Sequence, residues 1–428
     1  MRVAFLSLGC KVNQYEADAC AALFRERGAE IGAFDEKCDV YVVNTCSVTN
    51  IGDRKSRQML RRAKRLNPDA LVVATGCYAQ TARAEVEAIP EVDLVVGTAL
   101  RHRICDFVEA ALRGEKPDTQ VNIMREREFE ELNTEGSEER CRAYIKIEDG
   151  CDNFCSYCII PYARGPVRSR PKENILSEAS RLAAKGYREV VLTGIHVASY
   201  GKDLKNGQGL IDVIENVAKT EGLERIRISS IDPRAFTSDF IARAAACAKL
   251  CRHFHISLQS GSAEVLKRMN RKYTPEQYLD TLSRLRAAMP DCAVTTDIIC
   301  GFPGETDEEF AETLAFAEAA GFASIHVFPY SERRGTAAAD MEQLPHKLRE
   351  ERAARLSEVA AVFKAKFEEG HIGDSVNVLF EKTENGLAEG LSENYIRIFV
   401  PDRIDLTGEI RGVRITERQG GRVYGELI

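Results

Sequence analysis

The chain has 428 residues, with 59 Lys and Arg against 66 Asp and Glu, 14 Cys and no Trp. At roughly 150 residues per domain, this length predicts about three domains. Charged residues make up 29% and hydrophobic residues 44% of the chain, which argues against a disordered, fibrous or membrane protein. No apolar run approaches the ~18 residues of a membrane span. We therefore expect a soluble, cytoplasmic protein, whose thiols stay reduced and are partly used to bind metal.

The first 120 residues alternate short apolar runs with helical patterns. Buried strands separated by helices are typical of a parallel sheet covered on both faces. We expect a doubly wound parallel α/β domain at residues 1–120. Its predicted strands are Val3–Leu8, Val40–Asn44, Leu71–Thr75 and Leu94–Val96.

The composition changes between Arg125 and Glu139, where seven glutamates accumulate around Gly136 and Ser137. Charge runs of one sign are usually solvated. Residues 121–140 are therefore predicted to form a solvated acidic linker.

A second series of alternating strands and helices occupies residues 141–369. Six repeats predict an incomplete (β/α)6 barrel, an architecture that places functional groups on loops at the carboxyl ends of its strands. The charged helix expected at residues 347–369 would pack against this barrel. The predicted strands are Ala143–Ile147, Glu189–Leu192, Arg225–Ser229, His253–Leu258, Ala293–Ile299 and Ser324–Phe328.

The last segment, residues 370–428, contains short strands separated by turn residues. Five such strands predict a small antiparallel β-barrel. The expected strands are Ser375–Glu381, Leu387–Ser392, Tyr395–Val400, Gly408–Ile415 and Arg422–Leu427.

Three cysteines stand close together just after the first barrel strand, as Cys151, Cys155 and Cys158 in a CxxxCxxC pattern. Three thiolates in one loop can bind three irons of a [4Fe-4S] cluster and leave the fourth iron open. Tetrahedral zinc is the alternative, but it needs a fourth Cys or His, and residues 159–169 supply neither. The loop therefore favours an iron-sulfur site with an open iron.

Three further cysteines, Cys10, Cys46 and Cys77, each follow a predicted strand of the first domain. The carboxyl ends of parallel strands line one crevice, so these thiols can converge although they are far apart in the sequence. Buried structural cysteines are the alternative. Such cysteines usually lie inside strands, whereas these lie at strand-to-loop junctions. The positions predict a second cluster site.

The CxxxCxxC loop resembles the signature of the radical S-adenosylmethionine (SAM) superfamily, including the aromatic Tyr157 before the last Cys. The resemblance implies that the open iron binds the amino and carboxylate groups of SAM. It also implies that the reduced cluster cleaves SAM to a 5′-deoxyadenosyl radical. Tyr157 is a candidate cofactor-binding residue, and Gly194, Ser257 and Gln259, at other strand ends, look like further SAM contacts. Residues 193–196 depart from the Gly-Gly-Glu pattern common in that superfamily.

Nearly the whole chain resembles the methylthiotransferase family, on the motifs LGCKVNQYE, NTCSVT, CSYCIIPYARGPVRSRP and SLQSG. The resemblance implies two [4Fe-4S] clusters and a C-terminal TRAM domain that binds RNA. Cys151, Cys155 and Cys158 would ligate the SAM cluster, and the three cysteines of the first domain would ligate a sulfur-donating cluster. In that family one SAM methylates sulfur at the second cluster. Another SAM starts the radical reaction that puts the methylthio group on a C–H carbon.

The motif GCKVNQYE resembles the branch of the family that acts on N6-threonylcarbamoyladenosine beside the anticodon of tRNA, giving its 2-methylthio derivative. Branches that act on isopentenyladenosine in tRNA or on an aspartate of a ribosomal protein remain alternatives. A non-catalytic iron-sulfur protein that binds tRNA is another. The reaction would also need an external electron donor, such as a flavodoxin or ferredoxin, and a sulfur source.

Two basic stretches are candidates for binding the RNA backbone, because local positive charge binds phosphates even on an acidic protein. One is residues 54–65, with seven Lys and Arg, for which a solvated helix face is the alternative. Tyr395 and Phe399 are candidates for stacking on bases, with core packing the alternative for Phe399. The second stretch follows the CxxxCxxC loop and consists of Arg164, Arg168, Arg170 and Lys172.

Overall fold

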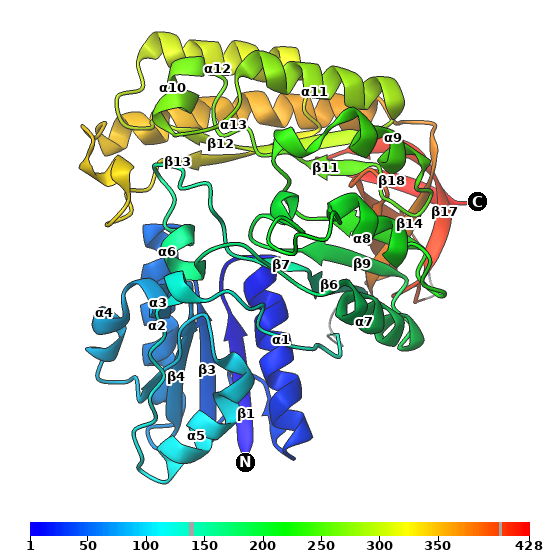
Figure 1. The fold of residues 1–428 in the computed structure, drawn as a ribbon. Coiled ribbons are helices and arrows are strands. Elements are labelled where there is room, and N and C mark those ends of the chain that lie inside the picture. The colour runs from blue at the N-terminus through cyan, green and yellow to red at the C-terminus, as the bar shows by residue number, and fades with distance from the viewer. Residues whose placement is uncertain (137–140, 402–404) are drawn as a thin grey trace.

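The computed structural model describes residues 1–136, 141–401 and 405–428. It contains an N-terminal parallel sheet, two central three-stranded parallel sheets and a closed C-terminal barrel. Figure 1 shows the N-terminal sheet, in blue, below the central sheets, with the C-terminal barrel, in orange to red, at the right of the central unit. Within the described ranges, no helix combines the length and the apolar character needed to cross a membrane.

The N-terminal sheet has five parallel strands in the order β2-β1-β3-β4-β5. Its strands are β1 (Arg2–Ser7), β2 (Glu30–Gly32), β3 (Val40–Thr45), β4 (Leu71–Gly76) and β5 (Leu94–Val95). The helices around it are α1 (Lys11–Glu26), α2 (Asn50–Leu66), α3 (Cys77–Thr81), α4 (Arg83–Glu87) and α5 (Ile104–Leu112). Tyr41 packs with Leu60 of α2 on one face, and Val42 packs with Phe24 of α1 on the other. Both faces are therefore covered, which confirms the doubly wound prediction.

All six strands expected in the central unit are present. They are β6 (Arg142–Lys146), β9 (Glu189–Thr193), β10 (Arg225–Ile228), β11 (His253–His255), β12 (Ala293–Cys300) and β13 (Ser324–Pro329). The sheets β6-β9-β10 and β11-β12-β13 are joined only by isolated bridges such as that between Ile231 and Ile256. The central unit is therefore an incomplete barrel, divided between β10 and β11.

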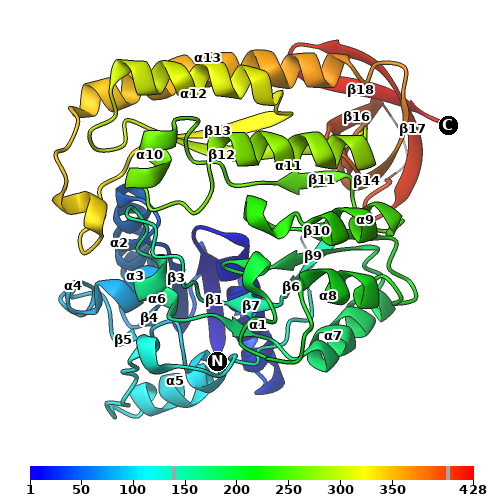
Figure 2. The same ribbon diagram turned by 45° about the horizontal axis from the view of Figure 1, so that its top comes forward.

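Helices cover the outer face of this incomplete barrel (Figure 2). They are α7 (Lys172–Ala184), α8 (Leu210–Val217), α9 (Ser238–Ala246), α10 (Ala263–Arg268), α11 (Pro275–Ala288), α12 (Asp307–Ala320) and α13 (His346–Glu369). Three short elements follow β6 in the chain, namely β7 (Glu148–Asp149), α6 (Ile160–Arg164) and β8 (Arg168–Ser169). The strands β7 and β8 pair antiparallel and so close the loop that carries the CxxxCxxC cysteines.

The C-terminal strands form a closed barrel in the order β14-β15-β16-β18-β17. They are β14 (Ser375–Glu384), β15 (Leu387–Ser392), β16 (Arg397–Pro401), β17 (Ile410–Gln419) and β18 (Arg422–Leu427). The β16–β18 pair is parallel and the other pairs are antiparallel. Arginines of β10 attach the barrel to the central unit: Arg225 donates to the carbonyl of Leu391 at 3.1 Å, and Arg227 to that of Ser392 at 3.1 Å.

The prediction of a solvated acidic linker is wrong for residues 130–132, whereas Glu128 and Glu135 are exposed as expected; residues 137–140 lie outside the described ranges. Glu130 accepts a hydrogen bond from Arg101 Nε at 2.9 Å, and Glu131 accepts one from Arg170 Nε at 2.9 Å. Leu132 is buried. The segment is held against the protein because its carboxylates pair with cations that the sequence does not place near them.

Helix α13 offers a test of the packing. Leu356 is fully buried, whereas Val362 on the same helix is 64% exposed. We expect Leu356→Ala to destabilise the protein by about 2–5 kcal/mol, because it removes methyl groups from a close-packed core. Val362→Ala should change stability little. Urea unfolding followed by circular dichroism measures both, and equal shifts for the two variants would contradict this packing.

Candidate active site

The three cysteines of the N-terminal unit lie at the carboxyl ends of three neighbouring strands. Cys10 follows β1, Cys46 follows β3 and Cys77 follows β4. Gly9 lets the first loop approach the second: its φ is +97°, and a Cβ there would lie 2.7 Å from the Cys46 sulfur. Only glycine adopts this conformation and leaves this space without strain. The structure thus brings together three thiols that the sequence separates.

Asn13 ties the two loops to each other. Its Nδ2 donates to the carbonyl of Leu8 at 2.8 Å and to that of Thr45 at 3.0 Å. These carbonyls lie just before Cys10 and Cys46. The side chain therefore fixes the ends of β1 and β3 and, with them, the spacing of two of the three thiols.

The CxxxCxxC loop is anchored to the central unit by backbone hydrogen bonds. The N–H of Cys151 donates to Gly165 at 3.0 Å, and the N–H of Ser156 donates to Met269 at 3.0 Å. Arg271 approaches the loop from the other side, and its Nη1 lies 3.4 Å from the Cys155 sulfur. Arg271 was not selected from the sequence, because it lies 116 residues beyond Cys155 in the chain.

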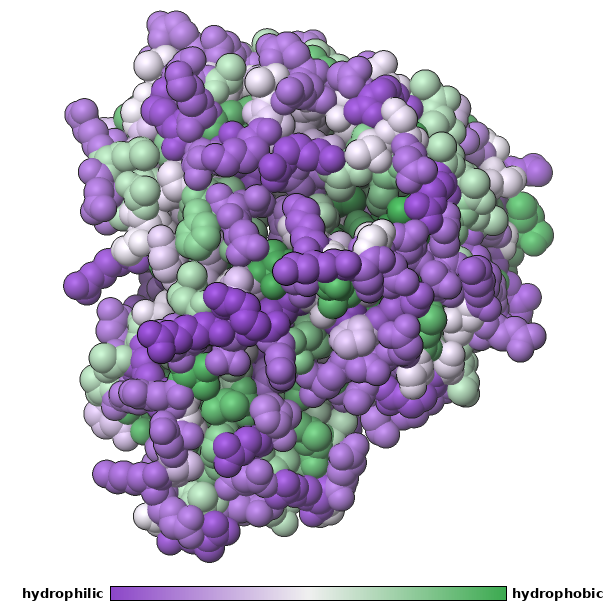
Figure 3. Space-filling view, in the orientation of Figure 1, coloured by the Kyte–Doolittle hydropathy of each residue, from purple (hydrophilic) through white to green (hydrophobic). Residues whose placement is uncertain are grey.

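One N-terminal cysteine and all three CxxxCxxC cysteines line a cavity of about 610 Å³. Cys10 lines it from the N-terminal unit, and the CxxxCxxC thiols line it from the central unit, at Cys151, Cys155 and Cys158. Figure 3, drawn in the orientation of Figure 1, shows a hollow in the middle of the molecule, where apolar residues lie behind a rim of hydrophilic side chains. A cavity of this size is in the range that holds a small-molecule cofactor or substrate.

The four predicted SAM contacts also line this cavity: Tyr157, Gly194, Ser257 and Gln259. At Gly194 a Cβ would lie 2.7 Å from a carboxylate oxygen of Glu148, so a side chain there would displace the buried wall behind the cavity. The structure thus brings these four positions together, and their contacts with SAM stay a prediction.

Asn153 and His196 are two further polar cavity residues that were not selected from the sequence. Asn153 Nδ2 and His196 Nε2 lie 3.0 Å apart, and both side chains line the cavity. His196 occupies the stretch that departs from the Gly-Gly-Glu pattern. That departure was the one available signal that another polar side chain stands there.

The donor set fits iron-sulfur clusters better than a single ion. Among the described residues, no three His, Cys, Asp or Glu side chains are close enough to hold one metal ion. In a [4Fe-4S] cluster each thiolate binds a different iron, so the sulfurs stand further apart. Burial raises the pKa of Cys46, Cys151 and Cys158 to about 12. These thiols need a compensating positive charge, such as iron, to become thiolates at neutral pH.

Three of the four basic residues after the CxxxCxxC loop do not contribute to the predicted RNA-binding surface. Arg164, Arg168 and Arg170 are buried, and each pairs with carboxylates inside the protein. On α2, in contrast, Arg54 and Lys55 are exposed. In the described part of the chain these two side chains have no ion-pair partner, so this surface remains available to a polyanion.

The two aromatic residues proposed for base stacking differ from each other: Tyr395 is 37% exposed, whereas Phe399 is buried, as its alternative expected. The ring of Tyr395 stacks on that of His253, with centroids 4.3 Å apart, which occupies one of its faces. Phe399 is 9% exposed. Near the cavity, however, Phe154 is 40%, Tyr162 46% and Phe328 42% exposed. These three rings were not selected from the sequence.

The fold is also found in a solved structure. The radical SAM methyltransferase TsrM from Kitasatospora setae, solved with tryptophan and a SAM analogue, is 18% identical to this chain with a TM-score of 0.57. The match covers 79% of this chain and 75% of that one. At this identity the likeness concerns the fold alone.

Two family descriptions match the sequence. The radical SAM superfamily matches residues 145–317, and uncharacterized protein family UPF0004 matches residues 2–97. The first range contains the incomplete barrel and its CxxxCxxC loop, so fold and loop together define a radical SAM protein. Such proteins use SAM and a [4Fe-4S] cluster.

Curated relatives narrow this class. The threonylcarbamoyladenosine tRNA methylthiotransferase MtaB of Bacillus subtilis is 44% identical, with 99% of this chain and 95% of that protein covered. The tRNA-2-methylthio-N(6)-dimethylallyladenosine synthase of Clostridium botulinum is 36% identical, with 98% and 95% covered. The chain belongs to the radical SAM methylthiotransferase family and is an enzyme.

The iron content tests the two cysteine sets. Anaerobically reconstituted protein should hold about eight irons per chain, as two [4Fe-4S] clusters. The variant Cys10→Ala/Cys46→Ala/Cys77→Ala should hold about four, and so should Cys151→Ala/Cys155→Ala/Cys158→Ala. Colorimetric iron and sulfide analysis gives these numbers. About four irons in the unaltered protein would mean that only one set binds a cluster.

Proposed function

We propose that this enzyme converts N6-threonylcarbamoyladenosine beside the tRNA anticodon to its 2-methylthio derivative. The observation that carries the proposal is the shared cavity, which is lined by Cys10 of the N-terminal set and by all three CxxxCxxC cysteines. A methylthiotransferase must hold SAM and a sulfur donor within reach of the same substrate carbon, and two facing thiol sets provide this. The 44% identity to a curated MtaB over 99% of the chain supports the same reaction.

In this proposal Cys151, Cys155 and Cys158 hold the SAM cluster, and the three N-terminal cysteines hold the auxiliary cluster. When bound, the clusters and SAM supply the electron, the radical and the sulfur. The chain supplies placement. The cavity positions of Gly194, Ser257 and Gln259 suit contacts with SAM, and the buried walls of the cavity exclude water from a reactive intermediate.

The surface around the cavity suits a single-stranded RNA loop. Unstacked bases bind to exposed aromatic rings, and phosphates bind to exposed cations. Phe328 lines the cavity, and Phe154 lies in the loop beside it. Arg54 and Lys55 stand on α2, which begins after the Cys46 loop. We place the anticodon loop of tRNA across this surface.

Lys11 favours the threonylcarbamoyl nucleoside over an isopentenyl one. It lines the cavity directly after Cys10 and has no hydrogen-bond or ion-pair partner among the described residues. Partial burial and two further cations, Arg142 and Arg227, lower its pKa to about 8, although Glu189 acts in the opposite sense. Withdrawing an ammonium group from water without a close partner is costly. The threonyl carboxylate would neutralise it, whereas the isopentenyl group carries no charge.

Several parts of the proposal concern partners outside the chain. An external electron donor, such as a flavodoxin or ferredoxin, reduces the clusters, and a separate source replaces the sulfur. We place the enzyme in the cytoplasm, where tRNA is found and thiols stay reduced. We also propose domain boundaries at residues 1–120, 141–369 and 370–428.

The alternative to the proposed substrate is isopentenyladenosine in tRNA or an aspartate of a ribosomal protein.

Nucleoside mass spectrometry tests the reaction. Transfer RNA from cells without the gene should lack 2-methylthio-N6-threonylcarbamoyladenosine and accumulate its precursor, N6-threonylcarbamoyladenosine. The wild-type gene should restore the mark, and Cys46→Ala should not, because it removes a ligand of the sulfur-donating cluster. If isopentenyladenosine loses its 2-methylthio group instead, the proposed substrate is wrong and isopentenyladenosine is the substrate.

Lys11→Met tests the substrate contact. A hydrogen bond to a charged group contributes about 1.5–3 kcal/mol, so kcat/KM for a threonylcarbamoyl-containing stem-loop should fall roughly 10–100-fold. A stem-loop with its threonyl carboxylate amidated should show a similar loss with the unaltered enzyme and little further loss with Lys11→Met. Equal losses on both substrates, or loss of iron, would assign Lys11 to the cluster instead.

A further inference from the structure

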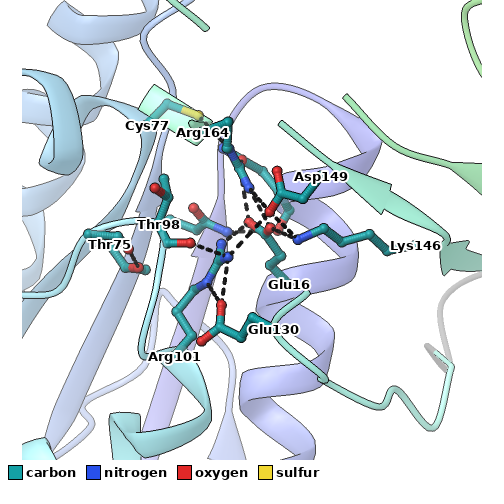
Figure 4. Close-up of polar contacts among 12 residues, drawn as sticks. Glu16, Thr75, Cys77, Thr98, Arg101, Glu130, Lys146, Asp149 and Arg164 are labelled. Atoms are coloured by element: carbon teal, nitrogen blue, oxygen red, sulfur yellow. Dashed lines mark hydrogen bonds and ion pairs between the residues drawn. The ribbon is translucent and has the colours of Figure 1, made fainter. Parts of the chain in front are cut away.

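One arginine of the central unit reaches into the N-terminal cysteine site. Arg164 ends α6, the short helix that follows the CxxxCxxC loop, and its side chain is fully buried. Its Nε donates to the sulfur of Cys77 at 3.2 Å. Figure 4 shows the guanidinium between this sulfur and the carboxylates of Glu16 and Asp149. The N-terminal thiol site is therefore completed by a residue from outside the N-terminal unit.

The same guanidinium also reaches the other two cysteine loops. Its Nη2 donates to Asn13 Oδ1 at 2.6 Å and to Glu16 Oε2 at 3.0 Å. Asn13 in turn holds the carbonyls before Cys10 and Cys46. One planar side chain thus touches Cys77 directly and the two remaining loops through a single amide.

The contact with Cys77 suits a metal-bound thiolate rather than a free thiol. A thiol sulfur is a weak acceptor, and a buried guanidinium gains little from directing an N–H at one. A thiolate carries negative charge, and hydrogen bonds between ionised groups are roughly twice as strong as neutral ones. Hydrogen bonds to cluster sulfurs also affect the reduction potential of the cluster.

We infer that Arg164 is a positioning residue for the auxiliary cluster. It contacts the cluster's ligand Cys77 and makes the cluster easier to reduce. The inference rests on the proposed assignment of Cys10, Cys46 and Cys77 as ligands of that cluster. Reduction adds one electron to the cluster, and a cationic N–H donor at its ligand stabilises the added negative charge. Docking of the central unit is then required to complete the site.

The competing explanation is that Arg164 only neutralises Glu16. Arg101, from the 3-10 turn Arg101–Arg103, provides a matched control. It is also fully buried and forms an ion pair with Glu16 and another with Glu130 at 2.8 Å. The structure records no contact between Arg101 and any of the three sulfurs. If replacing either arginine lowers the reduction potential of the cluster, the cause is the loss of an ion pair with Glu16. If only replacement of Arg164 lowers it, the cause is the contact with the Cys77 sulfur.

The test uses full-length protein in which Cys151, Cys155 and Cys158 are all alanine, so that only the auxiliary cluster remains. Redox titration with dithionite, followed by electron paramagnetic resonance, gives its midpoint potential before and after Arg164→Lys and Arg101→Lys. At the midpoint potential of the three-alanine protein, the added change Arg164→Lys should lower the ratio of reduced to oxidised cluster about tenfold, since a charged hydrogen bond is lost. With Arg101→Lys it should change little. Equal shifts in both variants, or no shift in either, would overturn the inference.

A second measurement covers the case in which Arg164→Lys does not fold. The same three-alanine protein, labelled with ¹⁵N-arginine and reduced, should show an electron-nuclear coupling to arginine nitrogen, and absence of this coupling would overturn the inference. The proposed function fails in a different way. If the three-alanine protein binds no cluster although it is folded, the ligand assignment itself is wrong.

Discussion

A single buried carboxylate holds the two halves of the active site in register. Glu16 of α1 is fully buried and pairs with Arg101, Lys146 and Arg164. Burial alone would raise the pKa of Glu16, but these three cations lower it below its ordinary value. Lys146 and Arg164 belong to the central unit. Separating the units would leave buried charges without partners, which is strongly unfavourable.

This constraint fixes which edges of the sheets face each other. Parallel strands place their loops at the carboxyl edge, and the ion pairs of Glu16 turn the two carboxyl edges together. Each cysteine set then has one arginine at a sulfur: Arg164 at Cys77 and Arg271 at Cys155. Outer groups of this kind orient and tune metal ligands. The site therefore depends on charges behind the cavity as much as on the thiols that line it.

The sequence predicted the strands and the thiols because both leave local signals. Strands buried on two faces are continuous apolar runs, and a cysteine after such a run lies at the sheet edge. The edge strand β2 was missed because it is three residues long, Glu30–Gly32, with only one large apolar side chain. Arg271 and Asn153 were missed because their role depends on neighbours distant in sequence.

The charged segments show why composition misled the prediction of the RNA surface. The glutamates before residue 137 and the arginines after the CxxxCxxC loop look like two solvated runs of opposite sign. In the fold they meet, because Glu131 pairs with Arg170 at 2.9 Å. Glu178, on α7, pairs with the same guanidinium. A charge that is neutralised internally cannot bind phosphate. In the proposed complex, phosphate contacts are therefore left to cations that stay exposed, such as Arg54 and Lys55 on α2, whatever the net charge of the chain.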